Sequence, residues 1–373
     1  MNRRLLGFML AALLALTVMG GANALAASDQ GDQAKFQAAY SRYQQAIEDM
    51  DAEAAANAAK EAVELGKTLL ADDSPSMAAL YVNYGMALVD AKRFEDAIPP
   101  LKAGIKRLEK LHGKTHESLI DPLWALADAY KGNLIQQHES IPYLKRVLRL
   151  VERIRGKDDL LFAKINQQLG EALYLSFYQQ PRAPAYLKTA YDTYQRLYNR
   201  PAFRTGLAAF WLGKSAMQRR NHALAEEYFY DALSLFEDTS APGHEFQMLA
   251  HTFLILLYEK RGKSDLADAH CQAISLLRPL TGVDGHMPLY KKVPVYPVEA
   301  LQWRREGFAL IEFTVTIRGT VTNMSVVESK GHKSFERAAL EAVKFFRYAP
   351  AVKDGELVET QGVRNLITFE MAR

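Results

Sequence analysis

The chain has 373 residues, of which 49% are hydrophobic and 24% are charged. These proportions are typical of a folded globular protein and exclude a disordered chain. The length is sufficient for two domains with separate cores. The formal net charge at pH 7 is only +3. Basic residues form no long run, which argues against nucleic-acid binding. The candidate basic pairs are Arg219-Arg220, Lys291-Lys292 and Arg304-Arg305.

Residues 1–26 are predicted to be a cleaved secretory signal. Arg3 and Arg4 give a positive start, and the stretch from Leu5 to Met19 is largely apolar. Ala24 and Ala26 then provide small residues for signal peptidase. The apolar stretch is shorter than the ~20 residues that a membrane span needs. We therefore expect an exported protein; the alternative is an uncleaved N-terminal segment that anchors the chain in a membrane.

Between residues 31 and 280, a helical-hairpin pattern returns at a spacing of 42 or 43 residues. At each return a small or aromatic residue stands where one helix is expected to pack on the next. These residues are Tyr43, Gly85, Ala127, Gly170, Gly213 and Ile255. A fixed period of this kind predicts an all-α solenoid built from helical hairpins.

The second helix of most units carries its own small residue, twelve positions after the first. These residues are Ala55, Ala97, Ala225 and Ala267, with Ser140 one position late. Four positions further, the larger residues Leu101, Phe229 and Cys271 are expected to fill the space where the two helices diverge. In the fourth unit two prolines obscure the pattern, and the second helix is expected to begin near Ala185.

These units resemble tetratricopeptide (TPR) repeats. The resemblance rests on the segments YVNYGMAL (81–88), FEDA (94–97), FWLG (210–213) and ALAEEYF (223–229). The connectors LHGKTHESL (111–119) and RGKDDL (155–160) are similar to the inter-repeat loops of kinesin-light-chain-type arrays. The period exceeds the usual ~34 residues, so each helix is expected to be about one turn longer.

The TPR resemblance implies that the helical region binds another protein. Groove residues of such arrays come mainly from the first helix of each repeat. The candidates here are Asn83, Asp128, Gln167 and Lys214. Their mixed charge identifies no particular ligand.

The helical pattern ends at residue 281, and the sequence changes in composition. Glycines and prolines mark a linker over residues 281–293, and residues 294–373 form a predicted second domain. Hydrophobic residues alternate over 309–317, which predicts a strand. Arg318-Gly319 then supplies a tight turn before a weaker strand over 320–328.

The remainder of this domain predicts one helix and one strand. Apolar residues at helical spacing from Phe335 to Phe346 form one stripe. Pro350 and a turn around Lys353 follow the helix, and the last strand has Val363 and Ile367 on one side. We therefore expect a small α+β domain in which a helix covers one face of a three-stranded antiparallel sheet.

This second domain resembles the TonB C-terminal domain. Over about 80 residues, matching positions occur in the order of the family pattern. The ones that carry the resemblance most clearly are Tyr296, Pro297, Glu306, Gly307, Gly319, Arg347 and Pro350. Phe346, Arg347 and Tyr348 stand where the family usually has Trp or Tyr before Arg-Phe-x-Pro, which is a mild variation.

The resemblance implies a mode of binding. TonB-family domains accept a short extended segment, the TonB box of an outer-membrane receptor, alongside the final strand. This is strand addition, in which backbone hydrogen bonds supply affinity and side chains supply selectivity. The candidate pairing residues are Val363, Arg364, Asn365, Leu366, Ile367, Thr368 and Phe369.

Two departures from TonB proteins affect the expected function. Their N-terminal anchor carries a Ser and a His, whereas residues 5–19 contain neither, and a TPR-like array replaces their proline-rich spacer. We therefore expect a periplasmic, Gram-negative protein that binds TonB-dependent receptors or TonB-system proteins, without transducing energy by itself. The alternatives are a scaffold for envelope assembly and an inner-membrane location through an uncleaved anchor.

No catalytic, metal or cofactor site is expected. Gly206 to Ser215 looks briefly like a phosphate loop, but the glycine spacing is wrong and no strand precedes it. His112 and His116 are four residues apart without a third ligand. Cys271 is the only cysteine, which excludes an internal disulfide, and it is expected to be a buried packing residue.

Overall fold

The structure is a computed structural model that describes residues 27–133, 135–176, 180–198, 202–236, 242–278 and 287–371. The predicted signal, residues 1–26, lies outside these ranges. Within them, no helix combines the length and apolar character that crossing a membrane requires. The chain divides into two compact units, Met1–Leu197 and Tyr198–Arg373.

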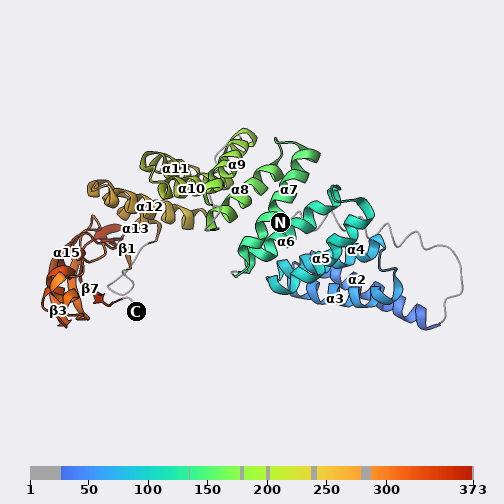
Figure 1. The fold of residues 1–373 in the computed structure, drawn as a ribbon, viewed down its shortest axis with the longest axis horizontal. Coiled ribbons are helices and arrows are strands. Elements are labelled where there is room, and N and C mark those ends of the chain that lie inside the picture. Colours follow the sequence, from blue (N-terminus) through green and yellow to red (C-terminus); the bar gives the residue numbers. More distant parts are fainter. Residues whose placement is uncertain are drawn as a thin grey trace. The chain divides into compact units, whose positions relative to one another are not determined.

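In its described residues, the first unit contains four helical hairpins, whose paired helices pack against each other (Figure 1). The hairpins are α2 (Ala27–Glu48) with α3 (Ala52–Leu69), α4 (Pro75–Asp90) with α5 (Phe94–His112), α6 (Ile120–Gly132) with α7 (Ser140–Arg155), and α8 (Leu160–Leu175) with α9 (Ala183–Leu197). Short 3₁₀ turns precede three of these helices: η1 (Glu117–Leu119), η2 (Gln137–Glu139) and η3 (Gln180–Arg182).

The second unit begins with two further hairpins and ends in an α+β domain. The hairpins are α10 (Phe203–Gln218) with α11 (His222–Phe236), and α12 (Pro242–Lys260) with α13 (Ser264–Leu277). The elements of the terminal domain are β1 (Pro288–Tyr290), α14 (Val298–Gln302), β2 (Gly307–Val315), β3 (Val321–Lys330), α15 (Ser334–Val343), β4 (Arg347–Tyr348), β5 (Ala351–Lys353), β6 (Glu356–Val358) and β7 (Thr360–Phe369).

The predicted small residues lie where paired helices approach most closely. A Cβ atom added to Gly85 would lie 2.5 Å from Cγ of Leu101, and one added to Gly213 would lie 2.8 Å from the ring of Phe229. Leu101 and Phe229 are fully buried, as are the predicted small residues of the second helices. The periodic pattern therefore located the packing contacts of the hairpins correctly.

Local capping explains where several helices begin. Asp51 accepts a hydrogen bond from the backbone N–H of Ala54, and Ser74 accepts one from that of Met77. Helix α9 begins at Ala183, two residues before the predicted start at Ala185. Pro184 therefore lies in the first turn, where its missing N–H breaks no helical hydrogen bond.

The terminal domain contains the predicted three-stranded antiparallel sheet, in the order β3-β2-β7. Inward-facing residues of the central strand β2 are fully buried, and α15 packs on that face with Phe335 and Val343. The alternating pattern of β2 and the apolar stripe of α15 therefore identified the core correctly. Residues 288–290, within the range predicted as linker, form β1 instead of irregular chain.

Two small strand pairs were not predicted, β1 with β4 and β5 with β6. Their strands have only two or three residues, which is too short for a recognisable alternating pattern. Asp354 (φ 54°) and Gly355 (φ 83°) both have positive φ, so the turn between β5 and β6 has the type I′ character that two-residue hairpins favour.

Candidate protein-binding site

The final strand, β7, lies at an edge of the three-stranded sheet. It pairs with β2, and no other strand in the described ranges pairs with it. An edge strand presents unpaired N–H and C=O groups along its outer side. β7 can therefore accept an additional strand.

The side chains of β7 alternate between the core and the surface. Val363, Ile367 and Phe369 are buried, while Arg364 and Leu366 are exposed. The exposed fraction of Leu366 is 54%, which is high for a leucine in a sheet. The side of β7 that faces away from the core therefore offers both an apolar side chain, Leu366, and a charged one, Arg364.

Polar contacts fix the middle of β7. Arg364 donates to Glu312 on β2 at 2.7 Å. Asn365 donates to the Tyr348 hydroxyl at 3.3 Å and accepts from the Lys291 ammonium at 3.1 Å. The strand is thus tied to β2, to β4 and to the segment that follows β1.

The end of β7 indicates which backbone groups face outward. The N–H of Met371 donates to the carboxylate of Glu306, just before β2, at 2.9 Å. Because N–H directions alternate along a strand, we expect the N–H groups of Leu366 and Thr368 to point to the opposite, unpaired side. These two residues are therefore the candidate donors for an added strand.

The tyrosine of the family pattern closes the core beside β7. Its ring packs edge-on against Phe335 and Phe369, with 5.7 Å between ring centroids in each case. The Tyr296 hydroxyl donates to the carbonyl of Arg305 at 2.5 Å. Pro297 follows as the N-cap residue of α14. These residues hold the chain entering the sheet.

The two glycines of the family pattern lie at close approaches. A Cβ on Gly307 would lie 2.0 Å from the carbonyl oxygen of Lys330. Gly319 has φ +76°, and its Cβ would lie 2.3 Å from the carbonyl oxygen of Tyr348 and 2.7 Å from Cβ of Cys271. Gly319, in the turn between β2 and β3, therefore lies between β4 and helix α13. Pro350 is buried.

Arg347 has a role that the sequence did not indicate. Its guanidinium donates to Glu259 on α12 at 2.6 Å, to Asp268 on α13 at 3.1 Å and to the carbonyl of Ser264 at 3.1 Å. The side chains of Arg347 and Glu259 are 7% and 2% exposed. This family-pattern residue is therefore an internal ion-pair partner of the last helical hairpin.

A second arginine adds to the same contact. Arg318 donates to Asp268 at 2.5 Å and to Asp265 at 3.4 Å, and Gln272 donates to the carbonyl of Ile317 at 3.1 Å. We call the contact formed by Glu259, Asp265, Asp268, Arg318 and Arg347 the arginine joint. It fixes the terminal domain on α12 and α13.

The arginine joint continues into the candidate binding strand. Tyr348, which follows Arg347, donates its N–H to the carbonyl of Gly319 at 3.0 Å and accepts from Asn365 of β7. Burial raises the pKa of the Tyr348 hydroxyl, so it stays neutral at physiological pH. Hydrogen bonds thus link the last hairpin, through β4, to β7.

The four groove candidates differ in their exposure. Asn83 and Gln167 are 5% and 4% exposed, and the amide of Gln167 donates to Glu171. Asp128 accepts from Gln168 at 3.3 Å. Asn83 and Gln167 therefore present little surface to a ligand, because neighbouring helices cover them.

Lys214 lies among aromatic rings. Its ammonium stands 4.3 Å from the centroid of the Trp211 ring and 5.3 Å from that of Phe253, and burial lowers its pKa. Cation–π contacts of this kind stabilise a partly buried lysine. Residues 206–215, which include Lys214, lie inside α10, so this segment is not a phosphate loop.

The remaining polar candidates have structural roles. The rings of His112 and His116 stack with 4.6 Å between centroids, and His116 caps η1 by accepting from the N–H of Ser118. Cys271 is fully buried, as predicted. Across the described ranges, no three His, Cys, Asp or Glu side chains gather as a metal site.

Comparisons with known proteins identify the terminal domain. Residues 292–371 match the family model described as Gram-negative bacterial TonB protein C-terminal. Protein TonB of Pseudomonas aeruginosa is 32% identical over 77 residues, 21% of this chain and 22% of that protein. Protein TonB of Escherichia coli K12 is 36% identical over 73 residues, 19% of this chain and 30% of that protein. The chain thus spans less than a third of either relative.

The helical region is similar to solved repeat structures. The kinesin light chain TPR-like repeats of Podosopora anserina align with 56% of this chain and 95% of that chain, at 15% identity and a TM-score of 0.45. The hairpins described above are themselves TPR-like in their order and packing. The chain therefore consists of a series of TPR-like hairpins followed, at residues 292–371, by a TonB C-terminal domain.

Proposed function

We propose that the protein is a periplasmic, non-enzymatic component of a TonB-type outer-membrane transport system. Its terminal domain binds extended segments of TonB-dependent receptors, or of TonB-system proteins, by strand addition at β7. The helical hairpins bind a second protein. The observation that carries the proposal is an unpaired edge strand in a domain that matches the TonB C-terminal family.

The arginine joint favours an adaptor over a force-transmitting spacer. A domain that is ion-paired to the preceding hairpin presents its edge strand in one orientation relative to α12 and α13. A partner of these helices would therefore be held near the segment bound at β7. Both domains are of interaction types, and the proposed role requires no catalytic group.

The direct test is binding of labelled TonB-box peptides to the full chain, measured by fluorescence anisotropy. Leu366→Pro removes an outward backbone donor, so we expect capture to weaken at least tenfold. Leu366→Ala keeps the donor and is the matched control, with an expected loss of no more than about threefold. Circular dichroism confirms that both variants remain folded.

Binding of box peptides no tighter than that of scrambled peptides would contradict strand addition to receptors. The location is tested separately, by fractionation and N-terminal sequencing of the native protein. A new N-terminus near Ala27 in the soluble periplasmic fraction is expected. An intact N-terminus in the inner membrane would contradict the cleaved signal.

A further inference from the structure

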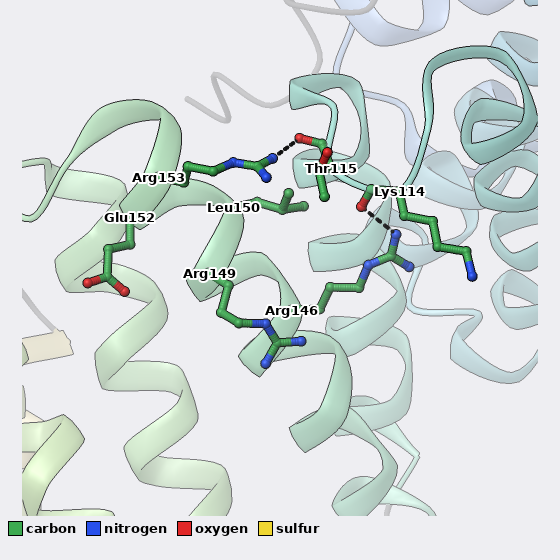
Figure 2. A pocket seen from close by; sticks show the side chains of 7 residues that line it. All are labelled: Lys114, Thr115, Arg146, Arg149, Leu150, Glu152 and Arg153. Carbon is green, nitrogen blue, oxygen red and sulfur yellow. Dashed lines mark hydrogen bonds between the residues drawn. The ribbon is translucent and has the colours of Figure 1, made fainter.

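A basic hollow opens in the first unit between helix α7 and the loop that follows α5. Its volume is about 580 Å³, and it is lined by Lys114, Thr115, Arg146, Arg149, Leu150, Glu152 and Arg153. Figure 2 shows the three arginines on one helix and Lys114 with Thr115 on the facing loop. The arginines follow the spacing i, i+3 and i+7, which places them on one face of α7.

Two of the four cations hold the hollow in shape. Arg146 donates to the carbonyl of Lys114 at 3.0 Å and pairs with Glu109 at 2.5 Å. Arg153 donates to the carbonyl of Thr115, and both bonds appear as dashed lines in Figure 2. Gly113, with φ +81°, lets the chain turn sharply at the end of α5. The loop is therefore fixed against α7 before any ligand arrives.

The other two cations are available. Within the part of the chain that the structure describes, neither the guanidinium of Arg149 nor the ammonium of Lys114 makes a hydrogen bond or ion pair. Both side chains are exposed at the hollow. The nearby carboxylates have other partners, since Glu152 pairs with Lys157 at 3.2 Å and Glu109 with Arg146. The hollow consequently presents uncompensated positive charge.

The carboxylates near the hollow limit which anionic ligands it can bind. Glu152 lines the hollow and Glu109 pairs with Arg146, while Glu117, further along the loop, pairs with Arg155 at 3.0 Å. Each of these carboxylates is paired, so Arg149 and Lys114 are the cations of the hollow that remain for a ligand. Two separate charges suit a segment that brings individual carboxylates better than a continuous anionic surface such as a membrane or a nucleic acid, which needs a longer basic surface. Leu150 forms the buried floor of the hollow and is only 4% exposed, so recognition would rest on the charged groups.

We propose that this hollow binds an acidic segment of a partner protein, with Arg149 and Lys114 as the carboxylate-binding residues. The inference rests on the proposal that the helical hairpins bind a second protein, and it is independent of strand addition at β7. Arg146 and Arg153 position the loop. Sequence reasoning missed the site because Lys114 and the arginines come together only in the folded chain.

The test measures binding of fluorescein-labelled hexaglutamate to the full chain by anisotropy, at 50 and 500 mM NaCl. Lys114→Gln/Arg149→Gln is compared with Lys60→Gln/Arg182→Gln, which removes two exposed cations of the same unit elsewhere. We expect salt-sensitive binding that the first pair of substitutions weakens about tenfold and the second leaves within about twofold. Hexaglutamine is expected not to bind.

Three results would overturn the inference: equal losses in the two double variants, no loss in either, or equal binding of hexaglutamate and hexaglutamine. Preferential binding of phosphatidylglycerol vesicles, abolished by Lys114→Gln/Arg149→Gln, would also overturn it in favour of a membrane ligand. Binding of TonB-box peptides at β7 should be unchanged by these variants. Failure at one site is therefore distinguishable from failure at the other.

Discussion

Arg347 on β4 and Glu259 on α12 form an ion pair of 2.6 Å in which neither side chain is more than 7% exposed. They are 88 residues apart in the sequence. A charge buried to this extent is tolerated when it is paired and its other donors are bonded. Asp268 and the Ser264 carbonyl accept hydrogen bonds from the remaining N–H groups of the Arg347 guanidinium. The pair therefore couples the stability of the TonB domain to that of the last hairpin.

Replacing Arg347 by Met should destabilise the second unit by about 3–5 kcal/mol, because it leaves the buried carboxylate of Glu259 without its partner. Arg347→Met/Glu259→Gln should recover part of that loss. Arg318→Met, at a side chain that is 57% exposed, should cost less than about 1 kcal/mol. Calorimetric unfolding of the three variants measures these differences. Equal stability of Arg347→Met and the wild type would refute a stabilising joint.

Gly319→Ala should be much more destabilising than Gly355→Ala. Both residues have positive φ, at 76° and 83°, so each alanine is expected to cost about 1–2 kcal/mol in backbone strain. Only the Cβ at 319 also meets the Tyr348 carbonyl and Cys271, while nothing lies within 4 Å of that at 355. The midpoints of thermal unfolding report the difference. Similar midpoints would mean that the turn at Gly319 does not pack closely on Tyr348 and α13.

Cys271 provides a single-site probe of the same contact. Burial raises the pKa of its thiol to about 12, so the thiolate fraction at pH 8 is on the order of a thousandfold below that of a free cysteine. A disulfide reagent should label the native protein slowly and the urea-unfolded protein rapidly. Labelling should accelerate in Gly319→Ala. Fast labelling of the native wild type would be incompatible with this packing.

A histidine pair in the last hairpin predicts loss of stability in acid. Nδ1 of His251 and Nδ1 of His270 are 2.9 Å apart, and burial lowers the pKa of each to about 4, with the charge of His270 contributing at His251. Two protonated rings would direct two N–H groups at each other. The folded state therefore favours neutral rings, whereas the unfolded chain takes up protons near pH 6.5.

Stability should consequently fall as pH drops from about 6.5 to about 4, by up to about 1.4 kcal/mol per pH unit for each proton taken up. Tyr230, Tyr258 and Glu226 face His270. The negative charge of Glu226 raises the pKa of His270 and so partly offsets the effect of burial. His251→Asn/His270→Asn should flatten the pH dependence of the unfolding midpoint between pH 7 and 4.5. An unchanged slope in that variant would assign the acid sensitivity to other groups.

Features that depend on local spacing were predictable. Gly85 and Leu101 contact each other because they lie sixteen positions apart on two antiparallel helices, and that spacing recurs in the sequence. Ile311 and Phe313 are buried because alternate side chains of β2 face α15. The start of α9 was predicted two residues too late. The error arose because a proline can lie just before a helix or within its first turn, so Pro184 did not fix the first residue.

Contacts between distant segments were not predictable in the same way. The pattern that marks Arg347 as a TonB-family residue contains no information about Glu259, which belongs to a helix of another domain. Asn83 and Gln167 looked suitable for a groove because they are polar and lie on first helices, but their burial depends on how neighbouring helices cover them.

The sequence by itself determined the kinds of element, the period of the hairpins and the family of the terminal domain, because helix and strand patterns follow from side chains a few positions apart. Only the tertiary structure decided that β7 lies at an edge, that Arg347 and Glu259 are paired, and that Arg149 and Lys114 share a hollow. These depend on which surfaces meet when the chain folds. Burial and charge pairing between segments far apart in the sequence leave no periodic signal in a single sequence.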